Sequence, residues 1–471
     1  MLRQSVSRKV FLENSTPMTD GCNEPTPGEG TGEERAEGRE VRNTLMLETY
    51  QVIVRVGWIF KTETIIMPAV LDAVVDSGLL RGLLPVLNRG GQSVPPLLFS
   101  SWLTRCPRKK WPLVGTSLLM AACFAVLAVA WGPLEARRPD LLALLFLVVY
   151  ASFSAANGLN QLAVAALQGK LIAPGHRGRA MLVSVSLGSV LAILAALLLL
   201  GRWLGQPDGF PKIFAVTALF FGLAAVVPAF LDEPADAAGG GDARPVGKEG
   251  GLWKRAQRGV GDWRRVVAAD RGLLRLTLVA ACFSAVLMLF PHYQAFARDQ
   301  LGSQIGSLLT WVVVQNAATG AASLVVGPFS DRRGTRLVLA WLVALSSVTP
   351  LVVTLLSLLP KSVAVEWFWI VYVPLGLNPL SLKLFTNYAL ELAPGPAEHP
   401  RYVSIVGGAL AAPFVLSPLV GIAVDRLGFQ PVFLVGAAAI ACGAAIATGL
   451  PEPRHRFSAG ETPIQAGGRD P

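Results

Sequence analysis

The chain has 471 residues, of which 52% are hydrophobic and only 15% are charged. A soluble chain would carry about 25% charged residues, so the composition excludes an ordinary soluble protein and predicts a polytopic membrane protein. The net charge of +10 is dispersed over short loops, which predicts contact with anionic lipid headgroups and excludes a nucleic-acid partner.

Apolar runs of about 20 residues predict an all-α membrane protein with twelve transmembrane helices. The expected spans cover approximately 48–73, 78–103, 112–132, 140–168, 181–203, 211–231, 273–296, 304–327, 336–359, 365–391, 402–424 and 430–450. A long linker separates the sixth span from the seventh. The spans therefore divide into two six-helix bundles, at 46–231 and 273–450.

Three segments outside the bundles have a different composition. Residues 1–45 are rich in Gly, Glu, Pro and Thr, which predicts a disordered tail, and residues 451–471 form a second polar tail. The linker at 232–272 begins with a flexible Gly- and Ala-rich part. Its second part spaces Trp253, Val260 and Trp263 among basic residues, which predicts an amphipathic helix on the membrane surface.

The distribution of Lys and Arg predicts the orientation. An even number of spans places both termini on one side. The loops on that side and the linker hold nineteen Lys and Arg, against eight in the loops on the other side. By the positive-inside rule, both termini are expected to be cytoplasmic.

Charged residues in the first two spans are the first candidates for a functional site. Lys61 and Glu63 fall near the middle of the first span, and a spacing of two residues places them about 200° apart on a helix, so they should not pair. Arg89 lies at a similar depth in the second span, and a Glu63–Arg89 pair would leave Lys61 free to face solute or another helix. Such a pair is either a structural lock or a substrate or proton site. The three residues together net +1, which favours an anionic or zwitterionic solute.

Polar side chains in later spans are the remaining cavity candidates. They are Asn157 and Gln161 in the fourth span, Gln315 and Asn316 in the eighth, and Lys383 and Asn387 in the tenth. Amides in a membrane either bind solute or hold helices together. Their convergence from both halves of the chain favours a shared cavity. His292 and Tyr293, near the end of the seventh span, form an external gate or are merely solvated.

A charged loop between the eighth and ninth spans has the pattern G-x3-D-R-x-G-x-R, from Gly327 to Arg336. A degenerate copy stands 227 residues earlier, where Thr104 replaces the aspartate and Pro107 replaces a glycine. Two other short motifs recur at nearly the same offset. One half of the chain therefore repeats the other, as in many secondary transporters.

With this loop the chain resembles the major facilitator superfamily over roughly residues 46–450. The residues that match the family's signature are Gly327, Asp331, Arg332, Gly334 and Arg336. The resemblance implies two six-helix bundles around a central cavity that opens alternately to each side, and it gives the signature loop a gating role. It also implies that the third, sixth, ninth and twelfth helices are peripheral. These spans are nearly free of strongly polar side chains, which independently favours contact with lipid.

The sequence thus predicts a monomeric secondary active transporter that moves a small solute by alternating access. Coupling to protons or ions, through Glu63, stays open. No cofactor is expected, and the G-x4-G-K-[ST] phosphate loop that would bind ATP is absent from the sequence. The alternative is a membrane sensor or scaffold that does not transport, which would have a cavity plugged by apolar side chains. A membrane-embedded enzyme would need a metal or nucleophile cluster that the sequence does not suggest.

Overall fold

The computed structural model describes residues 30–172, 174–206, 208–235, 263–394 and 398–452. Within these ranges every element is a helix. The first bundle contains α1 (Gly30–Ile59), α2 (Ile66–Val74), α3 (Gly78–Arg105), α4 (Lys110–Arg137), α5 (Pro139–Leu171), α6 (Pro174–Ala195), η1 (Ala196–Leu200), α7 (Gly201–Trp203), α8 (Gly209–Val226) and η2 (Val227–Phe230). The second contains α10 (Arg271–Leu301), α11 (Ser307–Arg333), α12 (Thr335–Leu356), α13 (Lys361–Trp367), η3 (Phe368–Val371), α14 (Tyr372–Leu375), α15 (Asn378–Leu392), α16 (His399–Ala411), η5 (Ala412–Leu416), α17 (Ser417–Leu427) and α18 (Phe429–Thr448).

Helices occupy all twelve expected spans, and some spans are built from two or more consecutive helices. Of the described segments, ten are long and apolar enough to cross a membrane. The first expected span is divided between α1 and α2, which shortens its apolar helical stretches, and α3 carries Arg81, Asn88 and Arg89 within its length, which lowers its mean hydropathy. Residues 30–45, which we expected to be an unstructured tail, are helical because α1 extends beyond its apolar part.

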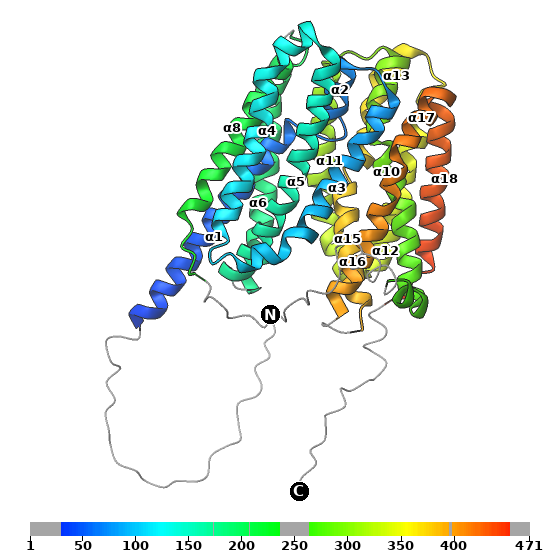
Figure 1. Ribbon diagram of the computed structural model, residues 1–471. Helices are drawn as coiled ribbons and strands as arrows, with labels where there is room; N and C mark the ends of the chain where they lie inside the picture. The colour runs from blue at the N-terminus through cyan, green and yellow to red at the C-terminus, as the bar shows by residue number, and fades with distance from the viewer. Residues whose placement is uncertain (1–29, 173, 207, 236–262, 395–397, 453–471) are drawn as a thin grey trace, which may run out of the picture.

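The helices run roughly parallel to one another, with the two bundles side by side (Figure 1). We call the end where α1 begins and α18 ends the terminal face, and the other end the opposite face. Within the bundles α4 packs on α5 and α8, and α12 packs on α18. These helices expose apolar side chains such as Val129, Leu219, Trp341 and Val435, which suits surfaces that contact lipid.

Two bundle-to-bundle contacts are made by glycines at the opposite face, where α3 crosses α17. A Cβ atom on Gly421 would lie 1.9 Å from the Gly78 carbonyl oxygen, and one on Gly82 would lie 2.5 Å from the Ser417 carbonyl oxygen. Only glycine allows the two backbones to approach this closely. The bundles are therefore in direct contact at this face.

Most of the expected amphipathic helix in the linker lies outside the described residues. Its last part, 263–269, is helical. Trp263, Val266 and Val267 pack against the apolar core of the second bundle. This end of the linker is therefore attached to the second bundle at the terminal face.

Candidate functional site

A cavity of about 570 Å³ lies between the two bundles. Its walls come from α1, α3, α5 and α6 of the first bundle and from α10, α11, α14 and α15 of the second, with the segment between α1 and α2. No described residue of α4, α8, α12 or α18 is among those that line it. The described residues of the third, sixth, ninth and twelfth helices thus contribute nothing to the cavity wall, as expected of peripheral helices.

The position of the cavity along the helices places it in the half of the molecule nearer the terminal face. Its lining continues along α5 from Asn157 to Gln168 and along α11 from Gln315 to Ser323. Both helices run towards the terminal face over these residues. Gln161 and Lys383 have exposed side chains on this wall. The cavity thus presents polar side chains on a partly apolar wall, is open, and is deep enough to reach the middle of the bundle.

The cavity ends at an interruption of the first span. Residues 60–65 are not helical, and the hydroxyl of Thr62 donates to the carbonyl of Ile59 at 2.9 Å. Pro68 explains the interruption, because in a continuous helix its ring would clash with the carbonyl of Thr64 and its missing N–H would leave that carbonyl unpaired. The chain instead begins α2 at Ile66, which places Pro68 in a first turn, where it is tolerated.

This interruption overturns the expected arrangement of Lys61 and Glu63. We predicted that they could not pair, on the assumption of a continuous helix. In the irregular segment, Lys61 Nζ lies 2.8 Å from Glu63 Oε1. The predicted Glu63–Arg89 ion pair is replaced by this one, although Glu63 and Arg89 do line the same cavity.

Of the two expectations for Lys61, facing solute or another helix, the structure shows the second, because Lys61 packs against α5 and is not among the residues that line the cavity. Its side chain is fully buried, and its ammonium lies 3.5 Å from the ring centroid of Trp58 and 4.4 Å from that of Phe153. Aromatic faces and one carboxylate thus replace the water that this cation loses on burial. Lys61 belongs to the wall behind the cavity surface.

The other carboxylate oxygen of Glu63 accepts a hydrogen bond from Asn88 Nδ2, and Asn88 Oδ1 in turn accepts one from Gln92 Nε2. Both oxygens of Glu63 are therefore engaged by the first bundle. Arg89, the next residue on α3, lies within electrostatic range of Glu63. Its guanidinium stands 6.0 Å from the Phe414 ring of the second bundle.

The amide candidates come together as the sequence suggested. Asn157, Gln161, Gln315 and Asn316 all line the cavity, as does Lys383. Asn387, one turn further along α15, has an exposed side chain but is not among the residues that line it.

Gln315 also connects the bundles, because its Oε1 accepts a hydrogen bond from Thr64 Oγ1 at 2.6 Å. This contact joins the interrupted segment of the first span to α11 at mid-bundle. It therefore closes the inner end of the cavity.

Arg55 is a cavity residue that our reading of the sequence missed. It lines the wall on α1, and its Nε donates to Ser189 Oγ at 3.0 Å. The signal was present, since Gln51, Arg55 and Trp58 recur at helical spacing and all three line the cavity. A charge inside an expected membrane span is costly, so Arg55 was as good a candidate for a functional residue as Lys61.

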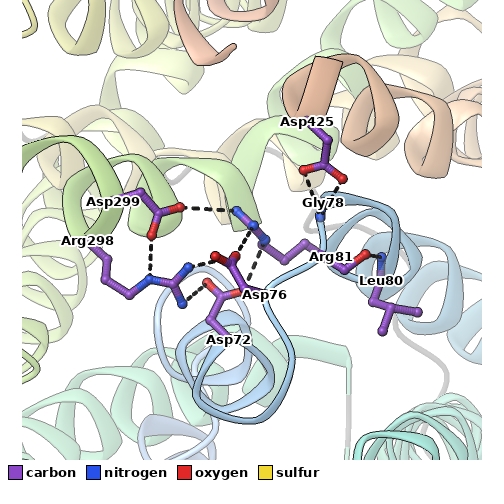
Figure 2. A network of polar contacts seen from close by, with 9 residues as sticks. Asp72, Asp76, Gly78, Leu80, Arg81, Arg298, Asp299 and Asp425 are labelled. Carbon is purple, nitrogen blue, oxygen red and sulfur yellow. Dashed lines mark hydrogen bonds and ion pairs between the residues drawn. The ribbon is translucent and has the colours of Figure 1, made fainter. Parts of the chain in front are cut away.

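The opposite face is closed by a network of ion pairs between the bundles (Figure 2). Arg81 Nε lies 3.0 Å from Asp72, and Arg81 Nη2 lies 2.7 Å from Asp76. From the second bundle, Arg298 reaches the same two carboxylates at 3.3 and 2.9 Å. Asp299 lies 2.6 Å from Arg298 and 3.9 Å from Arg81. Two cations and three carboxylates thus hold the bundles together across their interface.

A second contact closes the same face. Both carboxylate oxygens of Asp425, on α17, accept hydrogen bonds from the backbone N–H of Gly78, at 3.0 and 2.9 Å. Gly78 is the first residue of α3, so a carboxylate of one bundle meets the positive end of a helix of the other. Figure 2 shows this contact beside the arginine network.

His292 and Tyr293 are not solvated, so this one of the two expectations for them is wrong. Both side chains are fully buried. The Tyr293 ring packs on Phe433 of α18, with 5.1 Å between ring centroids. Tyr293 belongs to an apolar core that contains residues of both bundles, and a gating role for His292 and Tyr293 stays a prediction.

The signature loop lies at the terminal face, where α11 gives way to α12. Gly334 has φ +93°, a backbone conformation that L side chains rarely adopt, which explains the glycine at this position. Arg336 Nη2 donates to the Thr448 carbonyl at 2.9 Å, a contact within the second bundle. The structure does not describe the side chains of Asp331 and Arg332. Of Gly327 it describes only the place in α11.

These features are those of a two-bundle carrier, and comparison with known families decides the point. The family model of the Major Facilitator Superfamily matches residues 64–377 and 294–468. The chain belongs to the major facilitator superfamily. It is therefore a secondary transporter rather than an enzyme, as the sequence predicted.

Solved structures share the fold at low sequence identity. A POT family transporter in complex with 5-aminolevulinic acid has a TM-score of 0.65 at 12% identity, over 87% of this chain and 96% of that one. A point mutant of the nucleoside transporter NupG has a TM-score of 0.61 at 12% sequence identity, over 86% of this chain and 99% of that one. A bacterial homologue of the human lysosomal transporter Spinster has a TM-score of 0.60 at 14% sequence identity, over 91% of this chain and 99% of that one. No curated protein sequence matches the chain significantly.

Proposed function

We propose that this transporter carries a small polar solute in the central cavity, and that the structure represents its inward-open state. The observation that carries the proposal is the difference between the two ends of the interface. At the terminal face the cavity separates the bundles, whereas at the opposite face Arg81, Arg298 and Asp425 each make a contact from one bundle to the other. A carrier that opens alternately must break the second set of contacts to reach its other state.

The orientation follows from the charge distribution. Nineteen Lys and Arg belong to loops and the linker at the terminal face, against eight in the loops at the opposite face. We therefore propose that the terminal face is cytoplasmic, so that the cavity is open to the cytoplasm. The coupling ion and the monomeric state stay predictions.

The polar cavity also bears on the rival function. A sensor or scaffold with a transporter fold predicts a cavity filled by apolar side chains. Here amides and charged groups line a space of about 570 Å³, well within the range of ligand sites. This supports solute passage over a role in scaffolding.

Accessibility from each side of the membrane tests the proposal. Ala165 lines the cavity with an exposed side chain, and Leu84 lies buried on α3 behind the inner end of the cavity. In a protein with its five native cysteines replaced by serine, Ala165→Cys should react with an impermeant maleimide from the cytoplasmic side. Leu84→Cys should react from the external side, at a lower rate that reports the minor outward-open state.

Labelling of Ala165→Cys from the external side alone would refute the orientation. A Leu84→Cys variant that never reacts from outside, even when the contacts at the opposite face are removed, would show that the protein does not alternate and would favour the scaffold.

A further inference from the structure

The central cavity is lined by more cationic than anionic side chains, and its one carboxylate already has partners. Among the described residues that line it, Arg55, Arg89 and Lys383 are cationic, and Glu63 is the single carboxylate. Glu63 is already neutralised by Lys61 and bound by Asn88. The cavity surface therefore presents cations whose charge no lining carboxylate balances.

Each of the three cations keeps donors available for a ligand. Arg55 uses its Nε on the Ser189 hydroxyl, a neutral acceptor, which leaves the four N–H groups of its two terminal nitrogens. Arg89 stands beside the Phe414 ring, and among the described carboxylates none lies within 4.0 Å of it. The ammonium of Lys383 is on an exposed side chain at the cavity wall.

The cations come from both bundles. Arg55 and Arg89 belong to α1 and α3, whereas Lys383 belongs to α15. Arg55 and Lys383 lie within electrostatic range of each other across the cavity. Two like charges that face each other resist closure of the cavity, and an anion between them would remove that resistance.

We infer that the solute is a small anion, with a carboxylate or phosphate group held between the arginines of the first bundle and Lys383 of the second. This inference rests on the proposed function and gives its substrate class. Guanidinium groups suit carboxylate and phosphate geometry, and lysine adds a point charge. The uncharged part of the solute would lie against the amides of Asn157 and Gln315, which line the same space. A zwitterion is disfavoured because the carboxylate that would bind its ammonium group is engaged by Lys61.

The sign of the cavity potential can be measured without knowing the solute. In the cysteine-free protein, Ala165→Cys would be treated with a negatively charged and a positively charged methanethiosulfonate reagent, both small enough to enter. The ratio of the two rates is divided by the same ratio for free 2-mercaptoethanol. We expect the anionic reagent to be favoured by about tenfold or more, since a cleft lined by one sign of charge concentrates counter-ions by about 10- to 1000-fold.

Charge removal then identifies the source of the preference. Lys383→Gln should lower the normalised ratio by about threefold or more, and Arg89→Gln should lower it further. Because the Lys383 side chain is exposed, the first variant should fold normally. Lys361→Gln, an exposed lysine at the opposite face, is the matched control and should leave the ratio unchanged.

The outcomes separate this inference from the proposed function. A normalised ratio near one, or one that Lys383→Gln does not change, overturns the anion inference even if Leu84→Cys shows that the protein alternates. Conversely, a ratio of about tenfold or more in a protein that never exposes Leu84→Cys would leave the anion site standing and refute the transport cycle.

Discussion

Removal of the charge of Asp425 should shift the transporter towards its outward-open state. Asp425 accepts two hydrogen bonds from the N–H of Gly78 across the bundle interface. A hydrogen bond to a charged group contributes about 1.5–3 kcal/mol, and a charge at a helix N-terminus about 0.3–1 kcal/mol. Asn in place of Asp keeps one acceptor oxygen and loses the charge, so the expected loss is about 1–2 kcal/mol. Since this contact exists only while the opposite face is closed, the outward-open population should rise about 5- to 30-fold.

The assay is the rate at which an impermeant maleimide labels Leu84→Cys from the external side. Leu84 is buried and lies six residues beyond Gly78 on α3, or about 9 Å along the helix, so it becomes accessible only when the opposite face opens. Asp425→Asn should raise the rate about 5- to 30-fold if opening and closing are fast compared with labelling. Asp208→Asn is the control, because Asp208 is an exposed carboxylate at the same face whose side chain makes no cap hydrogen bond to its helix.

A rate unchanged by Asp425→Asn, or raised equally by Asp208→Asn, would refute the assignment of this contact to the closed gate. Labelling of Ala165→Cys from the cytoplasmic side should fall little, because the inward-open state remains the major one. A large fall in that rate together with a lower melting temperature would point to misfolding rather than to gate opening.

Two further predictions concern the interrupted first span and the signature loop. Glu63→Gln leaves the buried ammonium of Lys61 unpaired and should lower the free energy of unfolding by about 3–5 kcal/mol. The double variant with Lys61→Met should recover most of this loss, which a double-mutant cycle of melting temperatures would show. Additive losses from the two substitutions would argue against the pair. Gly334→Ala introduces a Cβ at φ +93°, 2.9 Å from Glu452 Oε1, whereas Gly428→Ala at φ +84° meets nothing closer than 3.9 Å. Both should be destabilising by about 1–2 kcal/mol from backbone strain, with a larger loss at Gly334, and equal losses would show that the contact with Glu452 is irrelevant.

The sequence by itself determined the class, the all-helical fold and the family of this protein, because those depend on local properties. Length and apolarity of each run fix whether it can span a bilayer, and the pattern from Gly327 to Arg336 is contiguous in the chain. The convergence of Asn157, Gln161, Gln315 and Asn316 was also predictable, since polar groups in a membrane must face an interior.

The partners of individual charges were decided only by the tertiary structure. The helical geometry assumed for Lys61 and Glu63 failed at an interruption whose local signal, Pro68, stood in the sequence but did not reveal where the side chains would point. The ion pairs of Asp72 with Arg298 and the contact of Asp425 with Gly78 join residues more than 220 positions apart. Their pairing depends on how the two bundles pack together, and the local sequence around a charge in one bundle does not indicate its partner in the other.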